Sequence, residues 1–142
     1  MLRVPPQAVL CYSHKTWRVE DKTPMHAESG YIRVIDCANV RRDPEEPAIL
    51  NVEAVIAQAT GLAEASKGLW TELCEPFGEH ATLELRSDSV AHAAKVQEIT
   101  RVYRALKDNN TLEVEVAMRT DTQPLQTHLK ATLQRVTAKV DA

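Results

Sequence analysis

Two histidines are the candidates for a ligand-binding side chain in this sequence. His128 lies in PLQTHL at residues 124–129, and His26 lies in TPMHAESGY at residues 23–31. A neutral imidazole is a good ligand for iron, and its second ring nitrogen usually donates to a carbonyl or carboxylate that fixes the ring. For His128 the competing interpretation is an ordinary polar residue after a proline turn. His26 suits a pocket residue and a structural residue bonded to Glu28 or a turn carbonyl equally well.

The other reactive side chains show no catalytic or metal-binding pattern. The remaining histidines have no ligand partner at a useful spacing, and the cysteines are odd in number with no CxxC pair, which argues against a disulfide framework and a zinc site. These residues are His14, His80, His92, Cys11, Cys37 and Cys74. No Ser-His-Asp order, P-loop or pair of catalytic carboxylates is visible. The cysteine usage favours a reducing, cytoplasmic location.

Length and charge set broad limits on the function. A chain of 142 residues fits one domain over 1–142, and its 44% apolar content can build a core. The net charge of -3, from 17 basic and 20 acidic residues, comes with no basic stripe, so nucleic acid is not expected as a partner. No apolar run approaches the length of a membrane span, so no membrane partner is expected either.

Most of the chain alternates apolar and polar residues with the period of a β-strand. The alternation is clearest at 111–119 and recurs at 81–90 and 28–35, whereas 52–58 is nearly continuously apolar and predicts a more buried strand. Turn residues at 21–24, 60–61, 78–79 and 108–110 separate these segments. Strands without helical separators predict an antiparallel meander. At 125–140 the leucines and valines suit an amphipathic helix and a strand alike, and periodicity does not decide between them.

Several motifs together resemble the nitrobindin family of haem-binding β-barrels. Besides the two histidine segments, VIAQATGLAE at 55–64 and AAKV followed by ITR at 93–101 are similar to family motifs in the same order. The similarity covers about residues 8–136. It implies an all-β, antiparallel, up-and-down, lipocalin-like barrel, with the last segment forming a strand through Val136.

The resemblance also implies a function. It makes His128 the proximal ligand of haem b iron and places His26 and Lys95 by the cofactor, Lys95 as a partner for a propionate, although an exposed lysine without that role fits equally well. No catalytic residue is implied beyond the haem iron. The implied activity is nitric oxide binding and isomerisation of peroxynitrite to nitrate, so whether the chain is an enzyme depends on haem. The alternatives are a non-catalytic haem or nitric oxide carrier or sensor, and an apo fragment without haem.

The chain departs from the family pattern in two places. The tryptophan-bearing GxWxGxG segment and the strands around it, roughly 30 to 40 residues or two to three strands, have no counterpart here, so the barrel is expected to be incomplete or open. Exposed strand edges are then expected to promote homodimers and to weaken hemin binding. The charged stretch 36–47 is longer than the family's hairpin and is predicted to be a mobile insertion.

Overall fold

The computed structural model describes residues 9–39, 47–72, 80–91, 95–106 and 110–136. Within these ranges every regular element is a β-strand, and no helix long and apolar enough to cross a membrane occurs. The strands are β1 (Val9–Trp17), β2 (Pro24–Asn39), β3 (Ala48–Gln58), β4 (Ala63–Glu72), β5 (His80–Ala91), β6 (Val96–Leu106), β7 (Thr111–Thr120) and β8 (Gln126–Gln134). The helical alternative for the last segment is wrong, and its strand ends two residues before Val136.

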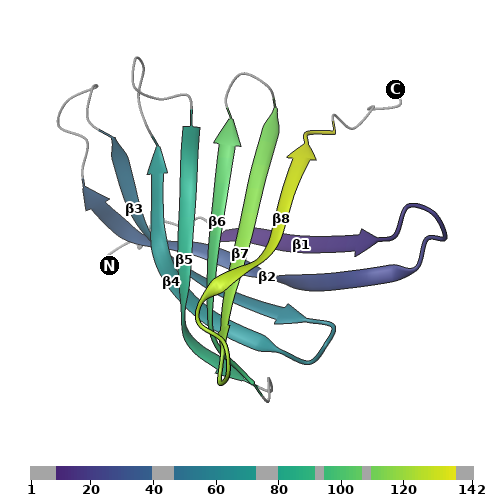
Figure 1. Ribbon diagram of the computed structural model, residues 1–142. Coiled ribbons are helices and arrows are strands. Elements are labelled where there is room, and N and C mark those ends of the chain that lie inside the picture. The colour runs from purple at the N-terminus through teal and green to yellow at the C-terminus, as the bar shows by residue number, and fades with distance from the viewer. Residues whose placement is uncertain (1–8, 40–46, 73–79, 92–94, 107–109, 137–142) are drawn as a thin grey trace, which may run out of the picture.

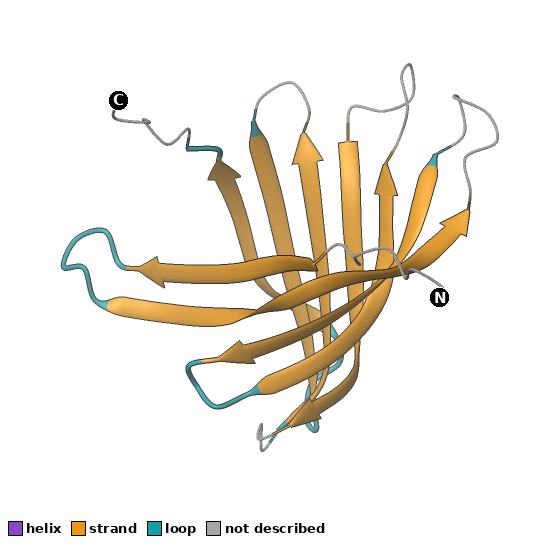
Figure 2. Cartoon of the chain, turned by 180° about the vertical axis from the view of Figure 1, so that it is seen from behind, coloured by secondary structure: helices purple, strands orange, loops and turns teal. Residues whose placement is uncertain are grey.

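All eight strands form one antiparallel sheet in chain order. Each strand pairs with its neighbour in sequence, so the chain is an up-and-down meander, as predicted. The sheet curls into an open half-barrel in which the β1 and β2 hairpin crosses in front of the later strands when seen from behind (Figure 2). Among the described residues β1 pairs only with β2 and β8 only with β7, so the predicted open barrel is confirmed.

The core lies on one face of the curled sheet because side chains alternate between the two faces along each strand, except at β-bulges. In β7 the side chains of Val114 and Val116 are buried while those between them are more exposed. β3 alternates too: Val52, Ala54 and Ile56 are buried but Val55 is 60% exposed. The strand predicted at 52–58 is therefore confirmed, and its burial is confined to one face, because only one face of this sheet packs against other side chains. The buried apolar cluster comprises Ile32, Val52, Ala54, Ile56, Leu62, Leu83, Leu85, Ile99, Tyr103, Val114 and Val116.

The connections agree in part with the predicted turns. Lys22, Gly61 and Asn110 have positive φ angles of 61°, 90° and 53° in the turns expected there. The predicted insertion at 36–47 is wrong over its first four residues, because β2 continues to Asn39 and pairs Asp36 with Asn51 of β3. Residues 40–46 lie outside the described part of the chain, as do the predicted turn at 78–79 and residues 108–109 of the next.

Gly30 in β2 is required by the close approach of β3. A Cβ atom at this position would overlap the Val55 carbonyl oxygen and lie 2.9 Å from the Ile56 Cα, both of them backbone atoms that cannot move independently. We expect Gly30→Ala to lower the free energy of unfolding by about 1–3 kcal/mol or more, because extra atoms in a tightly packed site typically cost this much. Urea denaturation measures this. Ser29→Ala, at the exposed neighbouring position, should change it by less than about 0.5 kcal/mol. Equal midpoints for the two variants would contradict the close approach.

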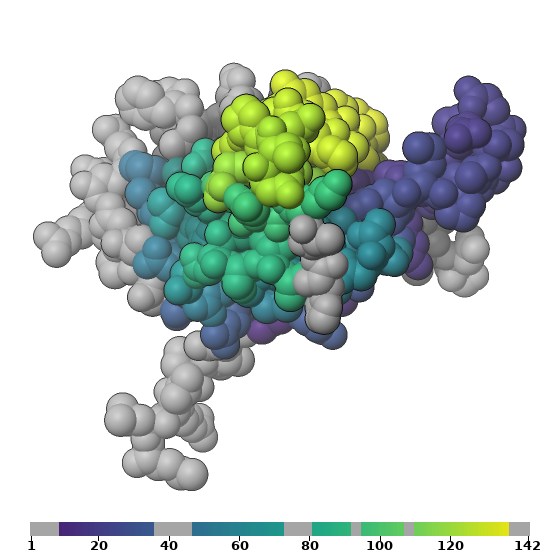
Figure 3. All heavy atoms as spheres, turned by 60° about the horizontal axis from the view of Figure 1, so that its bottom comes forward, coloured from purple at the N-terminus to yellow at the C-terminus, as the bar shows by residue number. Residues whose placement is uncertain are grey.

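The meander brings alternate connections to the same end of the sheet. The β1–β2, β3–β4, β5–β6 and β7–β8 connections must share one end, because each strand reverses direction. We call this end the site rim; it runs from the right to the bottom of the ribbon drawing (Figure 1). Seen from below, the β7–β8 end appears above β5 and β6 in the drawing, and the β1–β2 hairpin projects to one side (Figure 3).

Candidate functional site

The three residues predicted to contact a cofactor all lie at the site rim. His26 is the third residue of β2, His128 is the third residue of β8, and Lys95 comes directly before β6. Each therefore follows one of the connections that the meander gathers at this end. The topology alone places residues that are 33 to 102 positions apart in the sequence at the same end of the sheet.

His128 lies at a β-bulge on the last strand. Thr127 pairs with Ala117 and Leu129 pairs with Val116, so His128 is an extra residue without a partner in β7. Strict alternation, which would set His128 on the face opposite to Leu129, does not hold across a bulge, since bulges redirect side chains and are common beside functional sites. His128 is exposed, and within the described residues its side chain makes no hydrogen bond or ion pair. Its imidazole is thus available to an external ligand.

His26 combines the two interpretations that the sequence left open. Its Nε2 lies 3.0 Å from Oε2 of Glu28, the structural contact that one interpretation required. The side chain is also 29% exposed and lines a hollow of about 410 Å³ beside the β1–β2 hairpin. The hollow is lined by Lys15, Thr16, Trp17, Lys22, Pro24, His26 and Ala27.

Lys95 is exposed and tied to the β7–β8 end of the rim through its backbone. Its carbonyl oxygen accepts a hydrogen bond of 3.1 Å from the backbone nitrogen of Asp121, in the connection that leads to β8. The side chain has no ion pair within the described residues. Lys95 therefore stands on the His128 side of the rim, and its ammonium group is free to meet an anion there.

A buried charge cluster lies inside the rim, and the sequence interpretation missed it. The guanidinium of Arg101 bridges two carboxylates from other strands: Nη1 and Nη2 donate to Glu28 at 2.8 and 2.9 Å, and Nε donates to Glu64 at 2.7 Å. The side chains of all three residues are at most 2% exposed. Tyr12 donates to Oε1 of Glu28 at 2.6 Å, and Arg101 Nη1 donates to the Tyr103 hydroxyl at 3.4 Å.

Burial and charge pairing oppose one another in this cluster. Burial alone would raise the pKa of Glu28, but the hydrogen bonds and charge of Arg101 outweigh it and lower that pKa from its ordinary 4.5 to about 2. Burial likewise disfavours the Arg101 cation, yet Glu28 and Glu64 hold its pKa above the ordinary value. The pKa of Tyr12 is raised, first by burial and then by Tyr103 and Glu28. Glu28 and Arg101 are therefore both charged at neutral pH.

Alternation could have located part of this cluster. Arg101 lies between Ile99 and Tyr103 in β6, so period two already places a cation on the core-facing side. A buried arginine demands a carboxylate partner. The tertiary structure determines which carboxylates pair with Arg101, because Glu28 and Glu64 are 73 and 37 residues away in the sequence.

The depressed pKa of Glu28 predicts a loss of stability in acid. A group whose pKa is lower in the folded state stabilises it above the unfolded-state value, and that contribution is lost as the pH falls. We expect the free energy of unfolding to decrease as the pH drops from about 4.5 toward 2. Urea titrations at stepped pH values measure this. Glu28→Gln, which leaves Arg101 paired with Glu64, should show a shallower acid decline, and an equally steep one would exclude Glu28 as its source.

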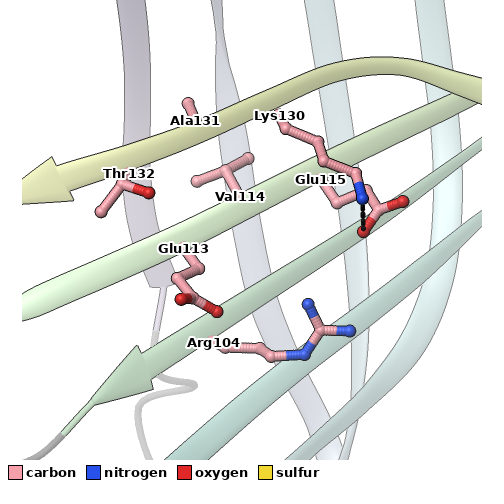
Figure 4. A pocket seen from close by; sticks show the side chains of 7 residues that line it. All are labelled: Arg104, Glu113, Val114, Glu115, Lys130, Ala131 and Thr132. Atoms are coloured by element: carbon pink, nitrogen blue, oxygen red, sulfur yellow. Dashed lines mark ion pairs between the residues drawn. The ribbon is translucent and has the colours of Figure 1, made fainter.

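A second hollow, of about 300 Å³, lies on the outward face of β6, β7 and β8 (Figure 4). Its charges come from Arg104, Glu113, Glu115 and Lys130, with an ion pair of 3.7 Å between the last two. Because two positive and two negative side chains line this hollow, it favours neither an anionic nor a cationic ligand. This hollow is lined by side chains of the outer face of the sheet.

The fold and site define a class of protein: an open, antiparallel half-barrel with histidines and a lysine at one rim and a buried charge cluster inside it. The family model described as THAP4-like, heme-binding beta-barrel domain matches residues 4–135. The chain therefore belongs to this haem-binding family, the nitrobindins, and haem is the cofactor of its domain.

Individual relatives agree with this assignment. A protein of Arabidopsis thaliana named peroxynitrite isomerase Rv2717c is 39% identical over 128 residues, which are 90% of this chain and 65% of that protein. The human peroxynitrite isomerase THAP4 is 33% identical over 92% of this chain and 20% of its own length. The crystal structure of Rv2717c from M. tuberculosis superposes with a TM-score of 0.70 at 32% identity, covering 91% of this chain and 73% of that one. The chain thus spans less than two thirds of the plant and human relatives.

Proposed function

We propose that the chain binds haem b with His128 as the iron ligand, and that the ferric haem binds nitric oxide and isomerises peroxynitrite to nitrate. The observation that carries the proposal is the position of His128, His26 and Lys95 at the same end of the half-barrel. The relatives named peroxynitrite isomerases support the choice of reaction.

The residues at the rim fit such a group. His128 offers an exposed imidazole without a competing hydrogen bond, and no cluster of three or more His, Cys, Asp or Glu side chains suited to a metal ion occurs in the described ranges. That donor set suits a cofactor which brings four of its own ligands and needs one from the protein. The Nε2 of Gln58, at the rim end of β3, is buried and has no partner within the described residues, so it can donate to a ligand oxygen or water.

Each rim residue has a distinct role in the proposed reaction. When bound, haem iron supplies a Lewis acid for an anionic oxygen ligand and a site for nitric oxide. His128 would hold the iron through its imidazole. Lys95 offers a positive charge to a propionate, and His26, fixed by Glu28, offers a polar group beside the hollow at the hairpin. The chain contributes positioning and charge, and no side chain takes part as a nucleophile.

Hemin titration followed by stopped-flow mixing tests the proposal. Hemin added to the chain should produce a Soret band with a saturable, one-to-one endpoint, and the loaded protein should speed the decay of peroxynitrite relative to the same amount of free hemin. Nitrate as the main product would establish isomerisation. Absence of a saturable endpoint would overturn haem binding itself.

A carrier or sensor without turnover is the second candidate function. It is favoured by the exposure of His128 and by the absence of a hydrogen-bond partner for its second ring nitrogen within the described residues. Such partners usually strengthen and orient a histidine ligand. Saturable binding of hemin and nitric oxide without faster peroxynitrite decay would establish this function and exclude the isomerase.

A further inference from the structure

The carboxylate of Glu28 is fully occupied by hydrogen-bond donors. Its Oε1 accepts from the Tyr12 hydroxyl at 2.6 Å and from Arg101 Nη1 at 2.8 Å, and its Oε2 lies 2.9 Å from Arg101 Nη2 and 3.0 Å from His26 Nε2. A carboxylate has about four acceptor positions, so these four contacts fill them. The Nδ1 of His14 stands farther off, at 3.7 Å from Oε1.

This arrangement decides which nitrogen of His26 carries a hydrogen. An ionised carboxylate can only accept, and the guanidinium of Arg101 keeps Glu28 ionised. The Nε2 of His26 must therefore be the donor, because an unprotonated Nε2 would set its lone pair against those of the carboxylate. In the neutral ring the lone pair then belongs to Nδ1, which makes no hydrogen bond within the described residues.

We propose that Glu28, anchored by Arg101, is a positioning residue that locks His26 in its Nε2–H tautomer and makes Nδ1 a hydrogen-bond acceptor and proton acceptor at the site rim. The ligand that such an atom recognises carries an O–H or N–H group, such as the protonated form of a small oxyanion. A proton passing from that O–H to Nδ1 gives an imidazolium and the free oxyanion, while Nε2–H stays bonded to Glu28. No electron is transferred and no covalent bond forms between protein and ligand.

The charged surroundings of His26 agree with this role. Glu28 is the anion in contact with it, Arg101 and Tyr12 act on it through Glu28, and the ring of His14 stands edge-on with centroids 6.0 Å apart. Lys15 and Lys22 line the same hollow, and their positive charges favour the oxyanion that remains once the proton has passed to Nδ1. The tautomer follows from the cluster alone, and only the identity of the ligand rests on the proposed function.

Nitrogen-15 NMR of the full chain without hemin, with His14→Phe to simplify assignment, tests the tautomer. At a pH where His26 is neutral we expect the pyridine-type signal at Nδ1 and the pyrrole-type signal at Nε2, with the Nε2–H form in roughly tenfold excess or more, as a hydrogen bond to a charged acceptor requires. Comparable amounts of the two tautomers of His26, or a dominant Nδ1–H form, would overturn the proposal.

Glu28→Gln and Glu64→Gln form a matched pair for the same experiment. Both remove one negative charge from Arg101, but only Glu28 touches His26. The Nδ1–H tautomer should become measurable in Glu28→Gln and stay absent in Glu64→Gln, and the same tautomer ratio in both would overturn the role of Glu28. With hemin bound, Glu28→Gln should slow peroxynitrite decay more than Glu64→Gln at equal Soret intensity. Loss of hemin binding in the parent chain would contradict the proposed function but leave the tautomer result standing.

Discussion

Arg101→Met should lower the free energy of unfolding at pH 7 by about 3–5 kcal/mol, the usual effect of removing one partner from a buried ion pair. The arginine side chain is 1% exposed and neutralises two carboxylates that are themselves at most 2% exposed. Without it, Glu28 and Glu64 would be buried anions side by side. Because small domains are stable by only about 5–15 kcal/mol, this single change approaches the limit of folding. Urea denaturation at 25 °C measures it.

The pH dependence of the Arg101→Met variant should run opposite to that of the parent. Burial without a cation favours the protonated carboxyl, so the destabilisation should shrink as the pH is lowered from 7 toward 5. The parent keeps its stability over that range and loses it only below about 4.5, as the depressed pKa of Glu28 requires. A variant whose deficit is independent of pH would show that lost packing, and not stranded charge, explains the effect.

Two further variants serve as controls for Arg101. Arg101→Lys keeps the positive charge but loses the planar guanidinium that reaches two carboxylates. Its free energy of unfolding should therefore lie between those of the parent chain and Arg101→Met. Arg119→Met removes an arginine that is 42% exposed and paired with Glu98 at 3.0 Å, and it should cost no more than about 1 kcal/mol. If Arg101→Met lowered the free energy of unfolding by no more than Arg119→Met does, the buried cluster would not be a main source of stability.

His128→Ala should lower hemin affinity by at least about 100-fold and remove the spectrum of a five-coordinate histidine complex. Loss of partners that merely orient a ligand costs about 10–100-fold, and loss of the sole protein ligand costs at least that much. The structure separates this effect from folding: His128 is exposed and lies at a bulge without a cross-strand partner. Its substitution should change the free energy of unfolding by less than about 0.5 kcal/mol.

Neighbouring positions provide controls for His128. Lys130→Ala alters an exposed residue two positions along the same strand, whose ion pair with Glu115 is 3.7 Å long, and should leave the Soret band unchanged. His26→Ala should keep the ligand spectrum while costing roughly 1 kcal/mol for the lost hydrogen bond to Glu28. An unchanged Soret band and hemin affinity in His128→Ala would exclude it as the ligand, and complete loss of haem in His26→Ala would move that role to His26.

Alternation in the sequence by itself predicted the strands with one apolar face, and turn residues predicted the connections after β1, β3 and β6. Residues 111–119 correspond to β7, 81–90 to β5 and 28–35 to part of β2, because a half-buried strand must repeat its apolar side chains every second residue. The motifs also predicted the family. Local pattern did not show that the apolar run of β3 is divided between a buried and an exposed face, and at β8 it left a helix and a strand open.

Only the tertiary structure decided the features that depend on contacts between distant strands. Pairing with β7 makes the last segment a strand and creates the bulge at His128, since a bulge is defined by two strands and not by one. The meander, and no local signal, brings His26 and Lys95 to the same rim. The partners of Arg101 are likewise fixed by the curl of the sheet, which carries Glu28 of β2 across to β6 over a separation of 73 residues. A sequence pattern specifies which face a side chain takes, but the groups it meets there depend on how the sheet closes.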